Sequence, residues 1–340
     1  MHPSEVSSCR AVIEPMPENL RSVQPGGGFC YRVELAWSAA RRWLLKRLRP
    51  GFVRRMAEVR QGSTEGAPHE ILDPRDLKYC RNQCTCYWDP VDDPFLWRDA
   101  LPVTRWGLAE LQLIGWTLAA LMGAGWWLYR PLAVVPAVPL VLLLWFFRNP
   151  RRQIPKGAGE IVCPADGKVA EIIRLADEPF VGGPAVRIGI FLSIFDVHLN
   201  RAPAAARVVA LRYRPGEFLN ALRAESAERN ENLWIGLEEE APPHRRMAVR
   251  QIAGAIARRI VCAARTGDSL ARGEVFGMIK LGSRTELVLP ATAELEVAVA
   301  VGQRVRAGST VVARYARHES AEPVREAAGG GAEEGGHATA

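Results

Sequence analysis

The sequence predicts a mainly β protein of the α+β class, in which a β domain follows a hydrophobic helical hairpin. Two observations support this fold class. From Ile161 onward, short runs of β-branched and other apolar residues are separated by glycine and proline, which is typical of strands joined by turns. Between Leu111 and Phe147, Arg130 is the only charged residue, which is typical of helices that contact lipid.

The first part of the chain, residues 1–104, shows little regular patterning. It alternates Arg-rich, Gly-rich and Pro-containing patches, and only Val33 to Leu48 has the periodicity of an amphipathic helix. We expect the rest of this extension to be disordered, and the residues before Leu101 to be dispensable. Residues 318–340 are mostly small or polar and are expected to form a disordered tail.

Residues 105–148 are predicted to anchor the chain in a membrane. The two apolar runs, Leu111 to Tyr129 and Pro131 to Phe147, each approach the ~20 residues that cross a ~30 Å hydrocarbon core as a helix. Three prolines interrupt the second run, so two short spans and one hairpin dipping into the bilayer both fit. A buried hairpin in a soluble core is the weaker alternative, because charge is nearly absent and several tryptophans suit a membrane interface.

Basic residues follow the second apolar run immediately: Arg148, Arg151, Arg152 and Lys156. The connection between the runs offers only Arg130, so the positive-inside rule places the following domain on the cytoplasmic side of the cell membrane. Anionic lipid headgroups would attract the same cluster, which accounts for part of the net charge of +7. No nucleic-acid partner is expected, because no recognition motif accompanies this charge.

The seven cysteines are odd in number and lack the dense spacing of a secreted disulfide scaffold, which favours a reducing compartment. Cys80, Cys84 and Cys86 are the closest group. Their spacing matches no common zinc finger and no fourth ligand stands in the usual register. We therefore expect unpaired thiols and no metal.

The β domain is expected to span residues 149–317. Its predicted strands are Val186 to Ile194, Arg207 to Tyr213, Leu233 to Leu237, Met247 to Ile252, Arg259 to Ala263, Val275 to Lys280 and Glu286 to Leu289.

An internal repeat lies within this domain, because Thr266 to Gly277 is echoed by Val301 to Val312. Each copy is predicted to form a turn, a pair of strand residues and a second glycine turn, and Pro164 to Val169 is similar to another such turn. The repeat resembles the hairpins of biotinyl- and lipoyl-type barrels, which implies a fold like the barrel-sandwich hybrid. A carrier module would need a lysine at the hairpin tip, and neither copy has one, so we interpret the repeat as scaffold.

The tripeptide Leu281-Gly282-Ser283 follows one predicted strand and precedes another. Taken alone, Gly-Ser is most often a turn. Glycine before serine also gives a backbone that accepts strain and a carbonyl that a neighbouring hydroxyl can attack. Gly282 and Ser283 are therefore a candidate reactive pair.

Several ordered segments give this pair a context. They are Phe147-Arg-Asn-Pro-Arg-Arg-Gln-Ile-Pro155, Val162-Cys-Pro-Ala-Asp-Gly-Lys-Val169, Ile194-Phe-Asp-Val-His-Leu-Asn-Arg-Ala-Pro203, Tyr213-Arg-Pro-Gly-Glu-Phe-Leu-Asn220, Glu228-Arg-Asn-Glu-Asn232 and Gln251-Ile-Ala-Gly-Ala-Ile-Ala-Arg-Arg-Ile260. Together with Gly282-Ser283 they resemble phosphatidylserine decarboxylases of the short bacterial type, over about Phe147 to Tyr315. Independent motifs in a fixed order are a far more specific signal than any one of them.

The resemblance implies a proenzyme that breaks its own Gly282–Ser283 bond and converts Ser283 into a covalent pyruvoyl group. The larger and smaller chains would stay together as a heterodimer, with further oligomerisation left open. The pyruvoyl group would serve as the electron sink for decarboxylation of phosphatidylserine in the membrane to phosphatidylethanolamine. No diffusible cofactor is implied.

The resemblance also assigns catalytic roles to His198 and Asp166, as a base and the carboxylate that fixes its tautomer. Without it, a structural imidazole and an Asx-turn residue would be the simpler interpretations. Longer relatives carry two histidines here, whereas this chain has only His198, with Arg201 three residues later. His198 would then serve both steps, or Arg201 would orient the substrate; a structural ion pair is the alternative for Arg201.

A competing hypothesis is a membrane-tethered barrel-sandwich adaptor without catalysis. It explains the anchor and the repeat but not Asp166, His198 and Gly282-Ser283. A denaturing gel separates the two, because the enzyme would appear as two fragments and the adaptor as one. The preference for a particular acyl chain or serine lipid is left open.

Overall fold

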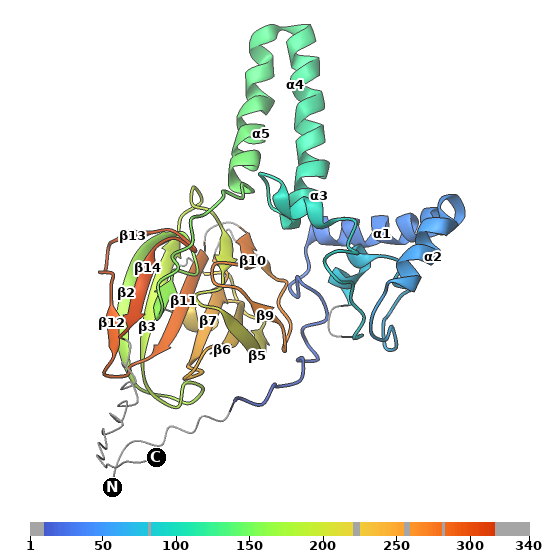
Figure 1. Ribbon diagram of the computed structural model, residues 1–340. Helices are drawn as coiled ribbons and strands as arrows, with labels where there is room; N and C mark the ends of the chain where they lie inside the picture. Colours follow the sequence, from blue (N-terminus) through green and yellow to red (C-terminus); the bar gives the residue numbers. More distant parts are fainter. Residues whose placement is uncertain (1–9, 81–82, 220–224, 255–258, 281–282, 317–340) are drawn as a thin grey trace, which may run out of the picture.

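The computed structural model describes residues 10–80, 83–219, 225–254, 259–280 and 283–316. A β domain lies at one side, a pair of long helices stands away from it, and a smaller helical unit lies at the base of these helices (Figure 1). The expected mainly β fold of the α+β class is confirmed. Residues 317–340, which include the expected disordered tail, lie outside the described part of the chain.

The largest element of the β domain is a curled antiparallel sheet. In the described residues its strand order is β13 (Arg304–Val305), β2 (Gly167–Glu178), β3 (Gly183–Leu192), β11 (Ser283–Pro290), β7 (Arg246–Ile252), β6 (Asn232–Glu239), β5 (Ala206–Arg214) and β9 (Ser269–Leu270). Apolar side chains of this sheet form the main core, in which residues such as Ile188, Leu233 and Leu287 are fully buried.

Two small sheets complete the domain. One has the order β1 (Glu160–Val162), β14 (Val311–Tyr315) and β12 (Leu295–Val297), and the other β4 (Leu199–Arg201), β10 (Val275–Lys280) and β8 (Arg259–Cys262). A short helix, α6 (Ser226–Arg229), precedes β6. The second small sheet packs against the base of the long helices through a separate apolar cluster that includes Phe146, Val197, Leu199, Val261 and Met278.

The predicted internal repeat is confirmed. Each copy forms a turn, a two-residue strand (β9 or β13), a second glycine turn and a longer strand (β10 or β14). The second turns contain Gly273 and Gly308, whose φ angles of 77° and 73° favour glycine. Ile154 lies between them, because a Cβ atom at either position would come within 2.4 or 3.0 Å of its Cδ1 atom. The two glycine turns of the repeat therefore pack against the same apolar side chain.

The long helices form a hairpin. Its first arm is continuous from Arg105 to Leu128, through η3 (Arg105–Gly107), α3 (Leu108–Glu110), η4 (Leu111–Gly115) and α4 (Trp116–Leu128). The second arm comprises η5 (Arg130–Ala133) and α5 (Val134–Phe146). Within the described residues, only the first arm is long and apolar enough to cross a membrane by length and composition. Large apolar side chains such as Trp127 and Val135 are exposed on both arms.

The described residues of the N-terminal extension, 10–80 and 83–104, form elements of their own, which differs from the expected lack of a fold in this part of the chain. The predicted helix is α1 (Phe29–Leu48), which begins four residues earlier than expected, and it is followed by α2 (Pro50–Glu58), η1 (Pro74–Tyr79) and η2 (Leu96–Ala100). A small apolar cluster that includes Met56, Ile71 and Trp88 is buried within this unit.

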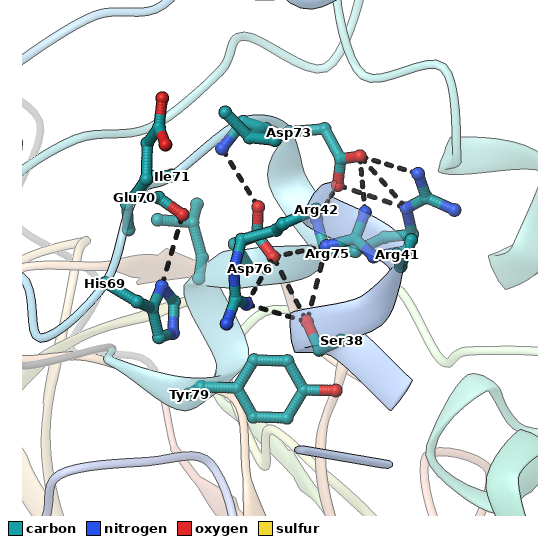
Figure 2. A network of polar contacts seen from close by, with 12 residues as sticks. Ser38, Arg41, Arg42, His69, Glu70, Ile71, Asp73, Arg75, Asp76 and Tyr79 are labelled. Carbon is teal, nitrogen blue, oxygen red and sulfur yellow. Dashed lines mark hydrogen bonds and ion pairs between the residues drawn. The ribbon is translucent and has the colours of Figure 1, made fainter. Parts of the chain in front are cut away.

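A buried ionic network explains why composition did not reveal this unit. Arg41 of α1 binds Asp73 at 2.6 Å and also pairs with Asp76, and both carboxylates are fully buried (Figure 2). Arg75 binds Asp73 as well, at 2.6 Å. Burial alone would raise the pKa of Asp73, but hydrogen bonds from Arg75 and the charges of Arg41 and Arg75 hold it below its usual range. Charged residues thus supply cross-links that a hydrophobic pattern cannot show.

The segment before α1 runs along the β domain. The backbone N–H of Glu14 donates to Val209 O at 2.8 Å, and the N–H of Cys262 in β8 donates to Val23 O at 2.8 Å. Leu20 belongs to the main core of the β domain and is buried. The expectation that residues before Leu101 are dispensable therefore needs revision, because this segment covers edges and core of the β domain.

Candidate active site

Ser283 is the first residue of β11 and lies in register with Leu192, the last residue of β3. It is fully buried, and its Oγ has no hydrogen-bond partner among the described residues. A buried polar group without a partner costs about 1–3 kcal/mol, and native proteins retain few of them. Such a hydroxyl is a candidate for a reactive group. Gly282, the other half of the predicted pair, lies outside the described residues.

A chain of buried side chains lies on the same face of β11, two residues beyond Ser283. Thr285 Oγ1 accepts a hydrogen bond from Asn200 Nδ2 at 3.0 Å, and Asn200 Oδ1 accepts one from Gln251 Nε2 at 2.9 Å. All three side chains are fully buried. Gly277 makes room for them, because a Cβ atom there would lie 2.8 Å from Gln251 Nε2. The sequence analysis did not single out these residues, because Asn200 and Thr285 stand beside charged residues, Arg201 and Glu286, and look like ordinary polar positions.

His198 directly precedes β4 and is fully buried. Its Nδ1 lies 3.0 Å from Asp196 O, and since a carbonyl oxygen only accepts hydrogen bonds, Nδ1 must carry the proton. Loss of solvation lowers the pKa of His198 to about 4, although the Asp196 contact acts in the opposite direction. At neutral pH the ring is therefore uncharged and Nε2 carries the lone pair, the form that a general base requires.

The loop that carries His198 is held by the base of the helical hairpin. The ring of Phe146 lies 4.7 Å from the imidazole, measured between centroids. Phe195 O accepts hydrogen bonds from Arg148 Nη2 at 2.8 Å and from Trp145 Nε1 at 3.3 Å. The contacts of Trp145 and Arg148 thus hold the loop that carries His198, and the Phe146 ring shields the imidazole from solvent.

Asp166 lies immediately before β2, and its two carboxylate oxygens are engaged by other partners. Oδ2 accepts a hydrogen bond from Arg152 Nη2 at 2.6 Å, and Oδ1 accepts one from the N–H of Ala307 at 2.7 Å. Burial raises the pKa of Asp166, and the charge of Arg152 opposes this. The contact that fixes the tautomer of His198 is made by the Asp196 carbonyl, which the sequence analysis did not identify.

Arg201 directs its guanidinium toward the backbone of neighbouring loops. Nη1 donates to Gly273 O at 2.9 Å, while Nη2 lies 3.3 Å from Asn149 Oδ1 and 3.4 Å from Pro150 O. These contacts join the chain entering the β domain to a glycine turn of the repeat. They match the structural alternative for Arg201 more closely than substrate binding, although its partners are carbonyl and amide oxygens instead of a carboxylate.

Cys80, Cys84 and Cys86 lie together in the N-terminal unit as free, buried thiols. The Sγ atoms of Cys84 and Cys86 are 3.6 Å apart. Burial raises the pKa of Cys86 to about 12, so the thiol stays protonated at neutral pH. Among the described residues, no group of three or more His, Cys, Asp or Glu side chains is arranged to hold a metal ion.

Comparison with known proteins identifies the chain's relatives. The family model described as phosphatidylserine decarboxylase matches residues 140–313. A phosphatidylserine decarboxylase proenzyme of Rhodopirellula baltica is 55% identical over 242 residues, which cover 70% of this chain and 99% of the relative. Proenzymes of the same name from Carboxydothermus hydrogenoformans and Symbiobacterium thermophilum are 47% and 43% identical, over 51% and 59% of this chain and 80% and 93% of their own lengths.

Proposed function

The chain belongs to the phosphatidylserine decarboxylase family, and we propose that it is a membrane-anchored, self-cleaving member that converts phosphatidylserine to phosphatidylethanolamine. The observation that carries the self-cleaving part is the buried hydroxyl of Ser283, which has no hydrogen-bond partner among the described residues and directly follows Gly282 in the sequence.

In the proposed maturation, Ser283 Oγ attacks the carbonyl carbon of Gly282 and its proton passes to His198 Nε2. The peptide C–N bond then breaks, which leaves an ester to Gly282 and a free amine on Ser283. Loss of the Ser283 Cα proton breaks the Cβ–Oγ bond, releases the Gly282 carboxylate and leaves a dehydroalanine. Water then replaces its nitrogen, which departs as ammonia, and the smaller chain begins with a pyruvoyl group.

The surroundings of Ser283 suit such a group. The pyruvoyl group supplies an electron sink for the loss of carbon dioxide. Asn200, Gln251 and Thr285 provide a fixed polar wall on its side of β11. His198 is neutral and kept dry by Phe146, so its Nε2 is assigned to accept the proton that the substrate's ammonium group gives up as it reacts. The same Nε2 then returns this proton to the substrate carbon after carbon dioxide leaves. Asp166 would act through Arg152 and the Ala307 backbone, by holding the start of β2 in place.

The two chains should remain together as a heterodimer. Cleavage before Ser283 makes β11 the first strand of the smaller chain, yet β11 lies between β3 and β7 of the larger chain. Two further strands of the smaller chain, β13 and β14, pair with β2 and β1 of the larger. Separation would break these ladders and expose the main core.

The proposed location is the cytoplasmic face of the cell membrane. The exposed apolar side chains of the hairpin favour burial in lipid, because soluble monomers rarely expose large contiguous apolar patches. Of the basic residues that follow the hairpin, Arg151 and Lys156 are exposed and would lie at the anionic surface, whereas Arg148 and Arg152 bind Phe195 O and Asp166 within the protein. The substrate's acyl chains are in the same bilayer, so the anchor brings the site to its substrate.

Replacement of the serine tests the proposed function. Ser283→Ala removes the attacking oxygen, so we expect one uncleaved chain of 37.5 kDa without decarboxylase activity, whereas the wild type gives two fragments. Ser269→Ala, at the exposed start of β9, is the control and should mature normally. Intact mass spectrometry of the fragments reports the cleavage position and the pyruvoyl end together. Activity in Ser283→Ala would refute the mechanism, and a single-chain wild type would favour the adaptor hypothesis.

A further inference from the structure

A pocket of about 510 Å³ lies where the N-terminal extension, the helical hairpin and the small sheet β4-β10-β8 meet. Phe29 and Cys30 of α1 line it on one side, and Leu118 and Leu143 of the two hairpin arms line it on another. Its volume falls within the about 300–1,000 Å³ of typical ligand sites. Its lining is mainly apolar, so it suits an apolar ligand.

The charged residues of the pocket gather at one end. Lys280 lies opposite Arg259 in the ladder of β10 and β8, and Lys280 also pairs with Glu110 at the start of the first hairpin arm. Ile114 and Leu118 follow Glu110 by one and two helical turns, so the apolar part extends along the hairpin away from these charges. The arrangement has the polarity of a lipid, with an apolar channel and a charged end that carries two basic residues and one acidic residue.

We propose that this pocket holds one acyl chain of the serine phospholipid, with the lipid phosphate near Arg259 and Lys280, and that α1 forms one wall of the acyl-chain site. The inference rests on the proposed function, because it concerns the substrate of that site. It adds a binding role for the N-terminal extension, which lies outside the residues 140–313 matched by the family model.

The depth of the pocket agrees with a lipid bound at the membrane surface. Glu110 and Leu118 are eight residues apart in one helix, which corresponds to about 12 Å at ~1.5 Å per residue. Half of a ~30 Å hydrocarbon core is about 15 Å. The apolar part of the pocket therefore spans most of one leaflet, while its charged end lies at headgroup level.

Part of the pocket lining lies beside the candidate active site. Phe146 lines the pocket and its ring packs 4.7 Å from the imidazole of His198. Lys280 is the last residue of β10, three residues before Ser283. A lipid with its chain in the pocket would thus have its headgroup close to both groups, without leaving the bilayer completely.

A pair of leucines on the same helix tests the proposal. Leu118→Trp fills the pocket, whereas Leu121→Trp is the matched control, because Leu121 is 55% exposed and does not line it. We would compare kcat/KM for dioleoyl-phosphatidylserine in mixed micelles with that for dihexanoyl-phosphatidylserine, whose chains are too short to reach Leu118 from the charged end. Cys30→Trp narrows the pocket from the α1 side and serves as a second variant should Leu118→Trp fail to fold.

We expect the ratio of long-chain to short-chain kcat/KM to fall about tenfold in Leu118→Trp and Cys30→Trp, and to stay within about twofold of the wild type in Leu121→Trp. Tenfold is ~1.4 kcal/mol, comparable with burial of about two methylene groups. Equal ratios in all four proteins would overturn the acyl-chain assignment and leave the decarboxylase function standing.

A binding measurement separates the inference from catalysis. Cys30 is partly exposed, whereas Cys80, Cys84, Cys86, Cys163 and Cys262 are buried. In a Cys9→Ser background, dioleoyl-phosphatidylethanolamine should slow maleimide labelling of Cys30 at least threefold, and dihexanoyl-phosphatidylethanolamine should not. Labelling that long-chain lipid leaves unchanged would refute the pocket assignment. Failure of the proposed function would appear separately, as an uncleaved and inactive wild type.

Discussion

Removal of the Phe146 ring should move the pH dependence of decarboxylation, because this ring excludes water from His198. Loss of solvation lowers the pKa of His198 from 6.5 to about 4, which corresponds to about 3 kcal/mol against the protonated form. Phe146→Ala would admit water beside the imidazole and raise its pKa toward 6.5. If about 1.5 pH units are recovered, only about a quarter of the enzyme has neutral His198 at pH 5, compared with about nine tenths in the wild type.

Phe147→Ala is the matched control. Phe147 is buried in the same apolar cluster, with its ring 5.0 Å from that of Phe146, so both substitutions should cost about 3–5 kcal/mol of stability. The assay is kcat/KM in detergent micelles from pH 4 to 8. We expect the acid limb to rise by about 1.5 units in Phe146→Ala only. An equal shift in Phe147→Ala, or no shift in either variant, would refute the link between the ring and the histidine.

The same pKa has a consequence for stability. Because folding lowers the pKa of His198, the unfolded chain takes up this proton at a higher pH than the folded protein does. The contribution of His198 to the free energy of unfolding is therefore fully present above pH 6.5 and is lost as the pH falls toward about 4.

Two further predictions concern the N-terminal unit and the hairpin. Asp73→Asn leaves Arg41 and Arg75 without a carboxylate partner at this position and should lower the free energy of unfolding by about 3–5 kcal/mol, measured as faster trypsin cleavage within residues 29–100. Because the pKa of Asp73 is lowered in the folded protein, its contribution to stability is present above about pH 3.9 and is lost as the pH falls below this value. Unchanged proteolysis would contradict the assigned role. Replacing residues 112–143 with a short Gly-Ser linker, which keeps Phe146 and Arg152, should release the enzyme from membranes and lower its activity on bilayers far more than on detergent-dispersed substrate. Equal loss in both assays would refute anchoring as the main role of the hairpin, because the same change removes pocket residues such as Leu118 and Leu143.

The sequence predicted the strands whose apolar residues face the core. Observed β7 and β10 match the predicted ranges within one residue at each end, because their apolar runs are bounded by clear breaks. β2 was missed, although it is 12 residues long, because Lys168, Glu171 and Arg174 give it the appearance of a polar surface segment. These charges lie on a strand that is only half covered, so hydrophobic alternation is weak there.

The sequence predicted those parts of the candidate site that consist of side chains with recognisable chemistry. The prediction was incomplete where a main-chain group makes the contact. Ser283 and His198 were found through motifs, and their burial agrees with roles in a closed site. The orienting group of His198 is a main-chain carbonyl, which every residue has, so no residue type marks it. The N-terminal unit was missed for a different reason, because buried ion pairs such as Arg41–Asp73 leave the composition polar.

The base of the hairpin packs against the elements that carry the candidate site residues. One apolar cluster contains Phe146 from the hairpin, Val23 from the N-terminal segment, and Leu199 and Met278 from the sheet β4-β10-β8. In that sheet, β4 follows His198 directly and β10 ends three residues before Ser283. Because a packed cluster of this kind resists deformation, a shift of the hairpin would also move Val197 and Leu199, the neighbours of His198 in the chain. The base of the hairpin therefore belongs to the packing that positions His198, and we expect substitutions at Phe146 to lower activity even in detergent, where no bilayer is present.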